Sequence, residues 1–149
     1  MARSYYSTVI DIASDLAWAA IRDFGHYGWA GVVSETHIED GRSGDAVGCI
    51  RDVSLSDRTI RQILLAHSDR DRSYTYAFCD ASPFPVHDYV ATIRITPVAD
   101  GNRSFVEWWA TFDCAADDRA RWVAFFADSF RQWLEALRCH LAATTGAGH

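Results

Sequence analysis

An apolar stripe within residues 117–141 constrains the fold more than any other feature of this sequence. Its members stand four, four, three, four and four positions apart, the spacing of one face of an α-helix. At about 1.5 Å per residue, such a helix is roughly 35–40 Å long and needs a broad apolar surface to cover it. Its large rings either fill a solid core or, against a curved sheet, leave a hollow. The stripe consists of Trp122, Phe126, Phe130, Trp133, Leu137 and Leu141.

Composition limits the remaining possibilities. A chain of 149 residues has the length of one domain, and we expect residues 1–149 to form a single domain. The net charge is −6 and no basic run occurs, which argues against nucleic acid or an anionic membrane as a partner. All 14 basic residues are arginine, so Schiff-base chemistry on a lysine is excluded.

The cysteines and histidines show no metal-binding or redox pattern. The four cysteines lie 30, 35 and 25 positions apart, and we interpret them as reduced, buried thiols. No HxxxH or HExxH spacing occurs, so we expect neither a metal nor another cofactor. The N-terminal residues contain no apolar signal-peptide core and no run is long enough to cross a membrane, which together predict a cytoplasmic protein.

The pattern of apolar and turn-forming residues in the first hundred positions predicts mainly strands. Ser14 is expected to cap a short helix that Gly25 ends, and a glycine-rich helical turn follows. Short turns join the later strands, which is typical of an antiparallel meander with its helices on one side. Pro97 is expected to end one strand, and Thr144 to begin a loose tail. The predicted strands are 4–12, 32–38, 46–55, 58–67, 73–79, 86–96 and 104–113.

Strand alternation places several polar groups among the inward-facing side chains. Arg51 is the most demanding of these, because a buried guanidinium needs a carboxylate, a water-filled space or a ligand. No carboxylate shares its predicted face on the next strand, which favours a wet cavity; the alternatives are an unplaced acid or a side chain that reaches the rim. Trp109 faces outward, either as an isolated ring or as a homodimer contact. The inward-facing polar residues are Arg51, Gln62, Tyr76, His87 and Tyr89.

The chain resembles the START-related, birch-pollen-allergen-like helix-grip superfamily (SRPBCC) in its order of elements and in two segments. These are the Val47-Gly48-Cys49-Ile50-Arg51-Asp52-Val53 run and the segment from the proline loop, Ser82-Pro83-Phe84-Pro85, to Tyr89. The chain is most similar to its bacterial polyketide cyclase/dehydrase-like branch, which itself resembles plant abscisic-acid receptors. The resemblance implies an α+β helix-grip fold, with a seven-stranded curved antiparallel sheet around the long C-terminal helix and two short helices after the first strand. The Leu55–Arg58 segment is shorter than the receptors' gate loop, which argues against hormone binding.

The resemblance also implies an internal cavity for a hydrophobic, lipid-like molecule. Residues at matching lining positions are Arg51, Val53, Leu55, Gln62, Tyr76, Val86, Tyr89, Trp108, Phe126, Phe130 and Leu134, and alternation adds His87 as a candidate ligand contact.

Three functions remain open at this point. The first is non-catalytic binding of a small hydrophobic or amphipathic molecule, with Arg51 at its carbonyl or anionic end. The second is a metal-independent cyclase, aromatase or dehydratase that uses Arg51, His87 and Tyr89 as catalytic groups in the same cavity. The third is a regulatory protein that binds a partner protein through the outer sheet face near Trp109.

Overall fold

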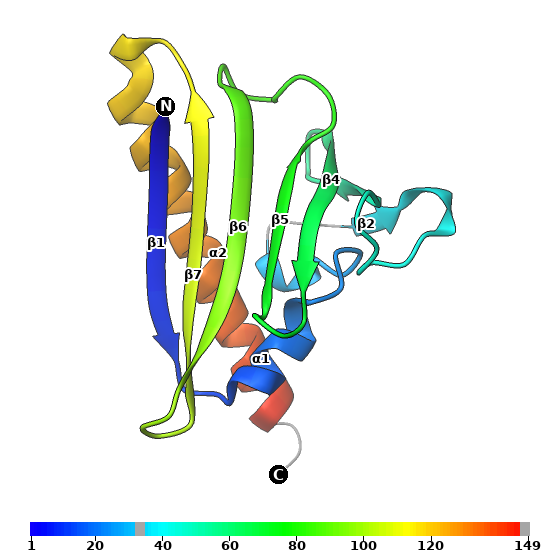
Figure 1. Cartoon of the computed structure of the whole chain (residues 1–149), viewed down its shortest axis with the longest axis vertical. Helices are drawn as coiled ribbons and strands as arrows, with labels where there is room; N and C mark the ends of the chain where they lie inside the picture. The colour runs from blue at the N-terminus through cyan, green and yellow to red at the C-terminus, as the bar shows by residue number, and fades with distance from the viewer. Residues whose placement is uncertain (32–34, 147–149) are drawn as a thin grey trace.

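The computed structural model describes residues 1–31 and 35–146, which form an α+β structure with one sheet and one long helix (Figure 1). The seven strands pair antiparallel in the order β1-β7-β6-β5-β4-β3-β2. The predicted fold class is thereby confirmed. The strands are β1 (Ala2–Ile10), β2 (Glu35–Ile38), β3 (Ile50–Ser54), β4 (Thr59–Ser68), β5 (Ser73–Phe78), β6 (His87–Val98) and β7 (Arg103–Asp113).

The predicted C-terminal helix is α2 (Arg119–Gly146), which has 28 residues. It packs chiefly against β1, β7 and the short 3-10 helix η1 (Gly28–Ala30), and Figure 1 shows it running behind β1 and β7. Phe126, Phe130, Leu137 and Leu141 of the stripe are buried, as is Leu134 beside it. The helix continues past Thr144, so the expected loose tail is wrong as far as Gly146.

The region after β1 departs from prediction at both ends of α1 (Ser14–Ile21). Ala13, not Ser14, is the N-cap, and no side chain caps the helix; Ser14 is its buried first residue. The helix ends four residues before Gly25, whose amide instead donates to the Asp23 carboxylate at 2.8 Å in a tight turn. Local hydrogen bonding by Asp23 thus replaces the predicted glycine stop.

The predicted strand 46–55 is shorter in the structure. Ala46 to Cys49 form a turn rather than the start of β3, because the Cys49 amide donates to the Ala46 carbonyl at 3.0 Å. The first part of the predicted strand 32–38 lies outside the described residues, and β2 covers the rest.

Pro97 lies inside β6 rather than at its end. The last paired residue of β5 on this side is Ser73, opposite Arg94, and the Ile95 amide still donates to the Arg72 carbonyl at 2.9 Å. Beyond Ile95, the described strand that pairs with β6 is β7. A proline is tolerated there because edge positions leave some amide groups without a ladder partner.

The inner face of the sheet follows the predicted alternation except at two bulges. Asp88 has a φ of 54° and the β6–β7 register shifts beside it, which turns His87 outward and corrects the expectation that it points inward. The β4–β5 register also shifts between Leu64 and Ala66, which leaves Ala66 exposed and buries most of the His67 side chain.

Other surface features follow from the same fold. Trp109 is half-buried on the outer face, and its ring stacks on Tyr5 with centroids 6.5 Å apart. All four cysteines are free, but only Cys49 is buried, and Cys139 is exposed, contrary to expectation. No described helix is long and apolar enough to cross a membrane.

Candidate functional site

A cavity of about 220 Å³ lies between the inner face of β4 and β5 and the first half of α2. Most of its surface is aromatic or aliphatic. The polar side chains on it come from Gln62, Tyr76, Tyr89 and Ser129. A mainly apolar wall with a few polar groups is the usual composition of a small-molecule site. The full lining is Leu55, Ile60, Gln62, Tyr76, Phe78, Phe84, Tyr89, Phe125, Phe126, Ser129 and Trp133.

Regular periodicity supplies two walls of the cavity. On β4, Ile60 and Gln62 are two residues apart and so face the same side of the sheet. On α2, Phe125, Ser129 and Trp133 recur every four residues, which brings them onto one helix face. The side chains of consecutive strands and of one helix face therefore converge on the cavity.

The proline-containing loop supplies the remaining wall through Phe84. Its ring packs against three aromatic residues of α2, with centroid distances of 5.7 Å to Trp122, 5.2 Å to Phe125 and 5.5 Å to Phe126. Phe125 is 42% exposed, so this aromatic cluster lies where the cavity approaches the surface.

Gln62 forms the polar end of the cavity together with Arg51, which lies behind it. The Arg51 Nε–H donates to Gln62 Oε1 at 2.7 Å, and Nη1 donates to the Phe24 carbonyl at 3.3 Å. Arg51 is 0% exposed and is absent from the cavity lining. Its hydrogen bond to a lining side chain is the one to Gln62.

Aromatic rings, rather than a carboxylate, surround the Arg51 charge. Its Cζ lies 3.9 Å from the ring centroid of Phe24, 4.0 Å from that of Tyr27 and 5.1 Å from that of Tyr76. Among the described residues no acid forms an ion pair with it, and its Nη2 is buried without a hydrogen bond. Desolvated cation–π contacts of this kind are worth about 2 kcal/mol or more, which offsets part of the cost of burial.

The tyrosines around this end keep their protons at neutral pH. Burial raises the pKa of Tyr76 and of Tyr89 above the ordinary value of 10.0. The Arg51 charge acts in the opposite direction on Tyr76, but burial has the larger effect. Both phenols therefore keep their O–H groups, and the two hydroxyls also interact with each other.

The structure divides the predicted site residues into three groups. Five line the cavity: Leu55, Gln62, Tyr76, Tyr89 and Phe126. Val86 and His87 lie on an adjoining open groove of about 450 Å³, which shares Phe78, Phe84 and Tyr89 with the cavity. Val53, Trp108, Phe130 and Leu134 are buried in the core outside the cavity lining, and Arg51 lies behind Gln62.

Several lining residues are missing from the predicted set, although some had a signal. Alternation already places Ile60 and Phe78 on the inner face, and Trp133 belongs to the helical stripe. Phe125 and Ser129 each lie one position from a stripe residue. Phe84 lies in an irregular loop, so no periodicity predicts where its ring packs.

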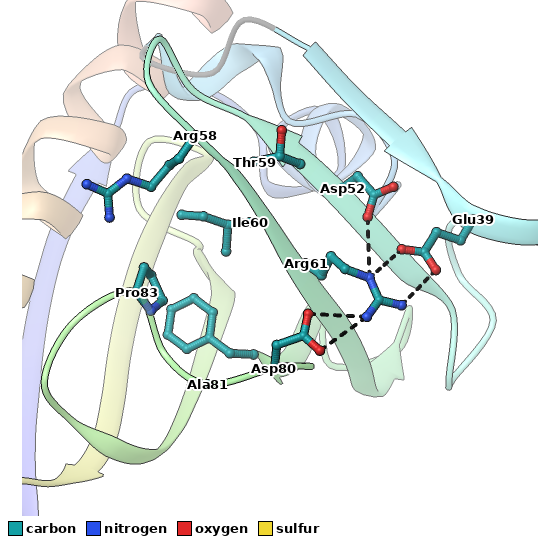
Figure 2. A pocket seen from close by; sticks show the side chains of 10 residues that line it. Glu39, Asp52, Arg58, Thr59, Ile60, Arg61, Asp80, Ala81 and Pro83 are labelled. Carbon is teal, nitrogen blue, oxygen red and sulfur yellow. Dashed lines mark hydrogen bonds and ion pairs between the residues drawn. The ribbon is translucent and has the colours of Figure 1, made fainter.

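A second pocket, of about 390 Å³, has a cluster of charged side chains around Arg61 (Figure 2). The guanidinium pairs with Glu39 at 2.7 and 2.9 Å and with Asp80 at 3.2 and 3.3 Å, while its Nε is 3.8 Å from Asp52. Arg61 lowers the pKa of Glu39 to about 2, whereas burial and the Glu39 carboxylate raise the pKa of Asp52. Because three carboxylates surround the Arg61 cation, we interpret this cluster as a link between the turn after β2, β3, β4 and the loop after β5.

Comparison with known proteins identifies the family. A family model described as "Polyketide cyclase / dehydrase and lipid transport" matches residues 1–142. The chain belongs to this family. No curated protein matches its sequence.

Solved structures support the fold of this polyketide cyclase/dehydrase family member. A Nitrosospira multiformis protein is 23% identical, with a TM-score of 0.80 over 96% of this chain and 98% of that one. The protein XoxI from Bacillus cereus is 26% identical, with a TM-score of 0.83 over 95% of this chain and 96% of XoxI. A Thermobifida fusca protein is 23% identical, with a TM-score of 0.85 over 96% of this chain and 95% of that protein.

Proposed function

We propose that this protein binds a small hydrophobic or amphipathic molecule in the cavity between the sheet and α2. The observation that carries the proposal is the lining itself, which is mainly aromatic and aliphatic with polar groups concentrated at Gln62, Tyr76 and Tyr89. Its volume of about 220 Å³ is below the roughly 300–1,000 Å³ of drug-sized sites, so we expect a ligand of one or two rings. The family description, which includes lipid transport, supports the same function.

A cyclase or dehydratase activity is the second candidate. Tyr76 and Tyr89 support it, because protonated phenols in a buried site can polarise a carbonyl group. Such a reaction also needs a group that removes a proton. Among the described residues that line the cavity there is no carboxylate, histidine or cysteine, and His87 is exposed on the neighbouring groove. Binding without turnover therefore ranks first.

Filling the cavity tests the binding function. Ser129 lies on the cavity face of α2, so Ser129→Phe places a ring in the space, whereas Ser129→Ala removes only the hydroxyl. We expect 2-acetylnaphthalene to bind the wild-type protein and Ser129→Ala with affinities within about threefold. Ser129→Phe is expected to bind at least tenfold more weakly, by isothermal titration calorimetry, with melting temperature as the folding control. Equal affinity for both folded variants would place the ligand elsewhere and reject the proposal.

A further inference from the structure

The hydrogen bond between Arg51 and Gln62 determines which end of the Gln62 amide is free. A guanidinium Nε–H can only donate, so the group that meets it at 2.7 Å must be the amide oxygen. The amide NH2 is then the other end of the side chain. Although a primary amide can normally present either an acceptor or a donor by turning over, Arg51 removes that choice.

The free NH2 group of Gln62 belongs to the cavity side. Gln62 lines the cavity and Arg51 does not, so the oxygen is bound on the side away from the cavity. The NH2 group donates no hydrogen bond to any part of the chain that the structure describes. It is not among the fully buried unpaired atoms of the described residues, and Gln62 keeps 8% of its surface exposed, so we place the NH2 group on the cavity surface, where a ligand oxygen can accept from it.

The charge of Arg51 strengthens this donor. The guanidinium is held between the rings of Phe24 and Tyr27 without a carboxylate among the described residues, so its positive charge is not neutralised nearby. A positive charge on the oxygen side of an amide polarises its N–H bonds, and hydrogen-bond chains strengthen one another in this way. The field at this end of the cavity therefore favours an electron-rich atom.

The other polar groups on the cavity do not supply a competing preference at this end. Tyr76 and Tyr89 carry rotatable hydroxyls that can donate or accept, and the raised pKa of each phenol keeps it protonated. The Ser129 hydroxyl donates to the Phe125 carbonyl at 2.9 Å and lies on the opposite wall, on α2. Gln62 is thus the lining group whose donor character the fold fixes.

We propose that Arg51 is a positioning residue that holds Gln62 as an obligate hydrogen-bond donor, so that the cavity selects hydrophobic molecules carrying an acceptor oxygen, such as an aryl ketone. This inference rests on the proposed binding function. It assigns the selectivity to Gln62, with Arg51 acting from behind.

A matched pair of probes isolates the hydrogen bond from size and shape. 2-Acetylnaphthalene and 2-isopropenylnaphthalene differ by C=O against C=CH2, and the cation 2-naphthylmethylammonium supplies only donors. Gln62→Glu is the informative variant, because one carboxylate oxygen keeps the contact to Arg51 while the other replaces NH2 by an acceptor. The new buried ion pair with Arg51 favours a folded variant, and thermal unfolding checks this.

We expect Gln62→Glu to bind the ketone at least tenfold more weakly than wild type and the ammonium probe at least tenfold more tightly, by calorimetry. The hydrocarbon should change by less than threefold. A purely structural role for Gln62 would move all three affinities together. Unchanged affinity of the ketone, or equal losses for all probes, would overturn the inference.

A measurement on the wild-type protein keeps the inference testable whether or not the variant folds. In a 1H–15N spectrum, the Gln62 side-chain NH2 protons are expected to shift downfield with 2-acetylnaphthalene but not with 2-isopropenylnaphthalene. Identical shifts with both probes would overturn the inference and leave the binding function intact. Failure of every naphthalene probe to bind would reject the binding function itself.

Discussion

Arg51 and Gln62 predict an energetic coupling that can be measured without any ligand. Arg51→Met removes the cation and leaves the Gln62 oxygen and the Phe24 carbonyl without their donor. Gln62→Leu leaves the Arg51 Nε–H without its acceptor. Each single substitution therefore leaves a buried polar group unpaired, which costs about 1–3 kcal/mol, and more for a charged group.

The double variant Arg51→Met/Gln62→Leu removes both partners at once. Hydrogen bonds from a charged donor contribute about 1.5–3 kcal/mol, and the 2.7 Å bond lies between two buried side chains. We therefore expect the double variant to be less destabilised than the sum of the two singles by about 1.5–3 kcal/mol. A urea slope of about 1–3 kcal/mol/M makes this a difference of about 1 M in midpoint.

Urea unfolding at pH 7, followed by circular dichroism, measures the four free energies of this cycle. Arg51→Met combined with Leu65→Ala is the control, since Leu65 is exposed and the two changes should add within about 0.5 kcal/mol. A coupling below about 0.5 kcal/mol between Arg51 and Gln62 would refute the assignment of this hydrogen bond as the fixed contact behind the cavity.

Two further predictions concern the core and the charged cluster. Phe130 is fully buried, and its ring stacks on that of Trp108 with centroids 5.1 Å apart. Phe130→Ala should therefore lower the free energy of unfolding by about 3–5 kcal/mol, whereas Phe125→Ala, at an exposed position, should lower it clearly less. Equal losses for the two variants in urea unfolding would contradict this packing. The Glu39 pKa is lowered from 4.5 to about 2, so its carboxylate stabilises the fold above pH 4.5 and loses this contribution as the pH falls toward 2. The raised pKa of Asp52 has the opposite sign and favours the fold while that group is protonated. Glu39→Gln should therefore have a lower free energy of unfolding than wild type at pH 6, and the two free energies should converge as the pH falls to 2. A difference that stays constant over this range would exclude the Arg61–Glu39 pair as the cause of the lower stability.

Periodicity predicted the helix and the sheet because both depend on local pattern. The stripe from Trp122 to Leu141 fixed the buried face of α2, and alternation placed Tyr76 and Tyr89 on the inner face of the sheet. Alternation fails where the backbone inserts a residue, as it does at Asp88, and this is why His87 faces outward.

The surroundings of Arg51 could not be predicted from the sequence for a different reason. The sequence indicates that the guanidinium is buried, but Phe24 and Tyr27 come from the irregular segment between α1 and η1. Their position over the guanidinium depends on tertiary packing that no spacing rule describes. The same holds for Phe84, whose loop is placed by contacts with α2.

A crystal structure of the protein grown with 2-acetylnaphthalene is the most direct test of the central claim. We predict density for the naphthalene ring between Phe126 and the inner face of β5, with the ketone oxygen within hydrogen-bond distance of the Gln62 NH2 group. A cavity closed by its own side chains, or density only on the protein surface, would contradict the account.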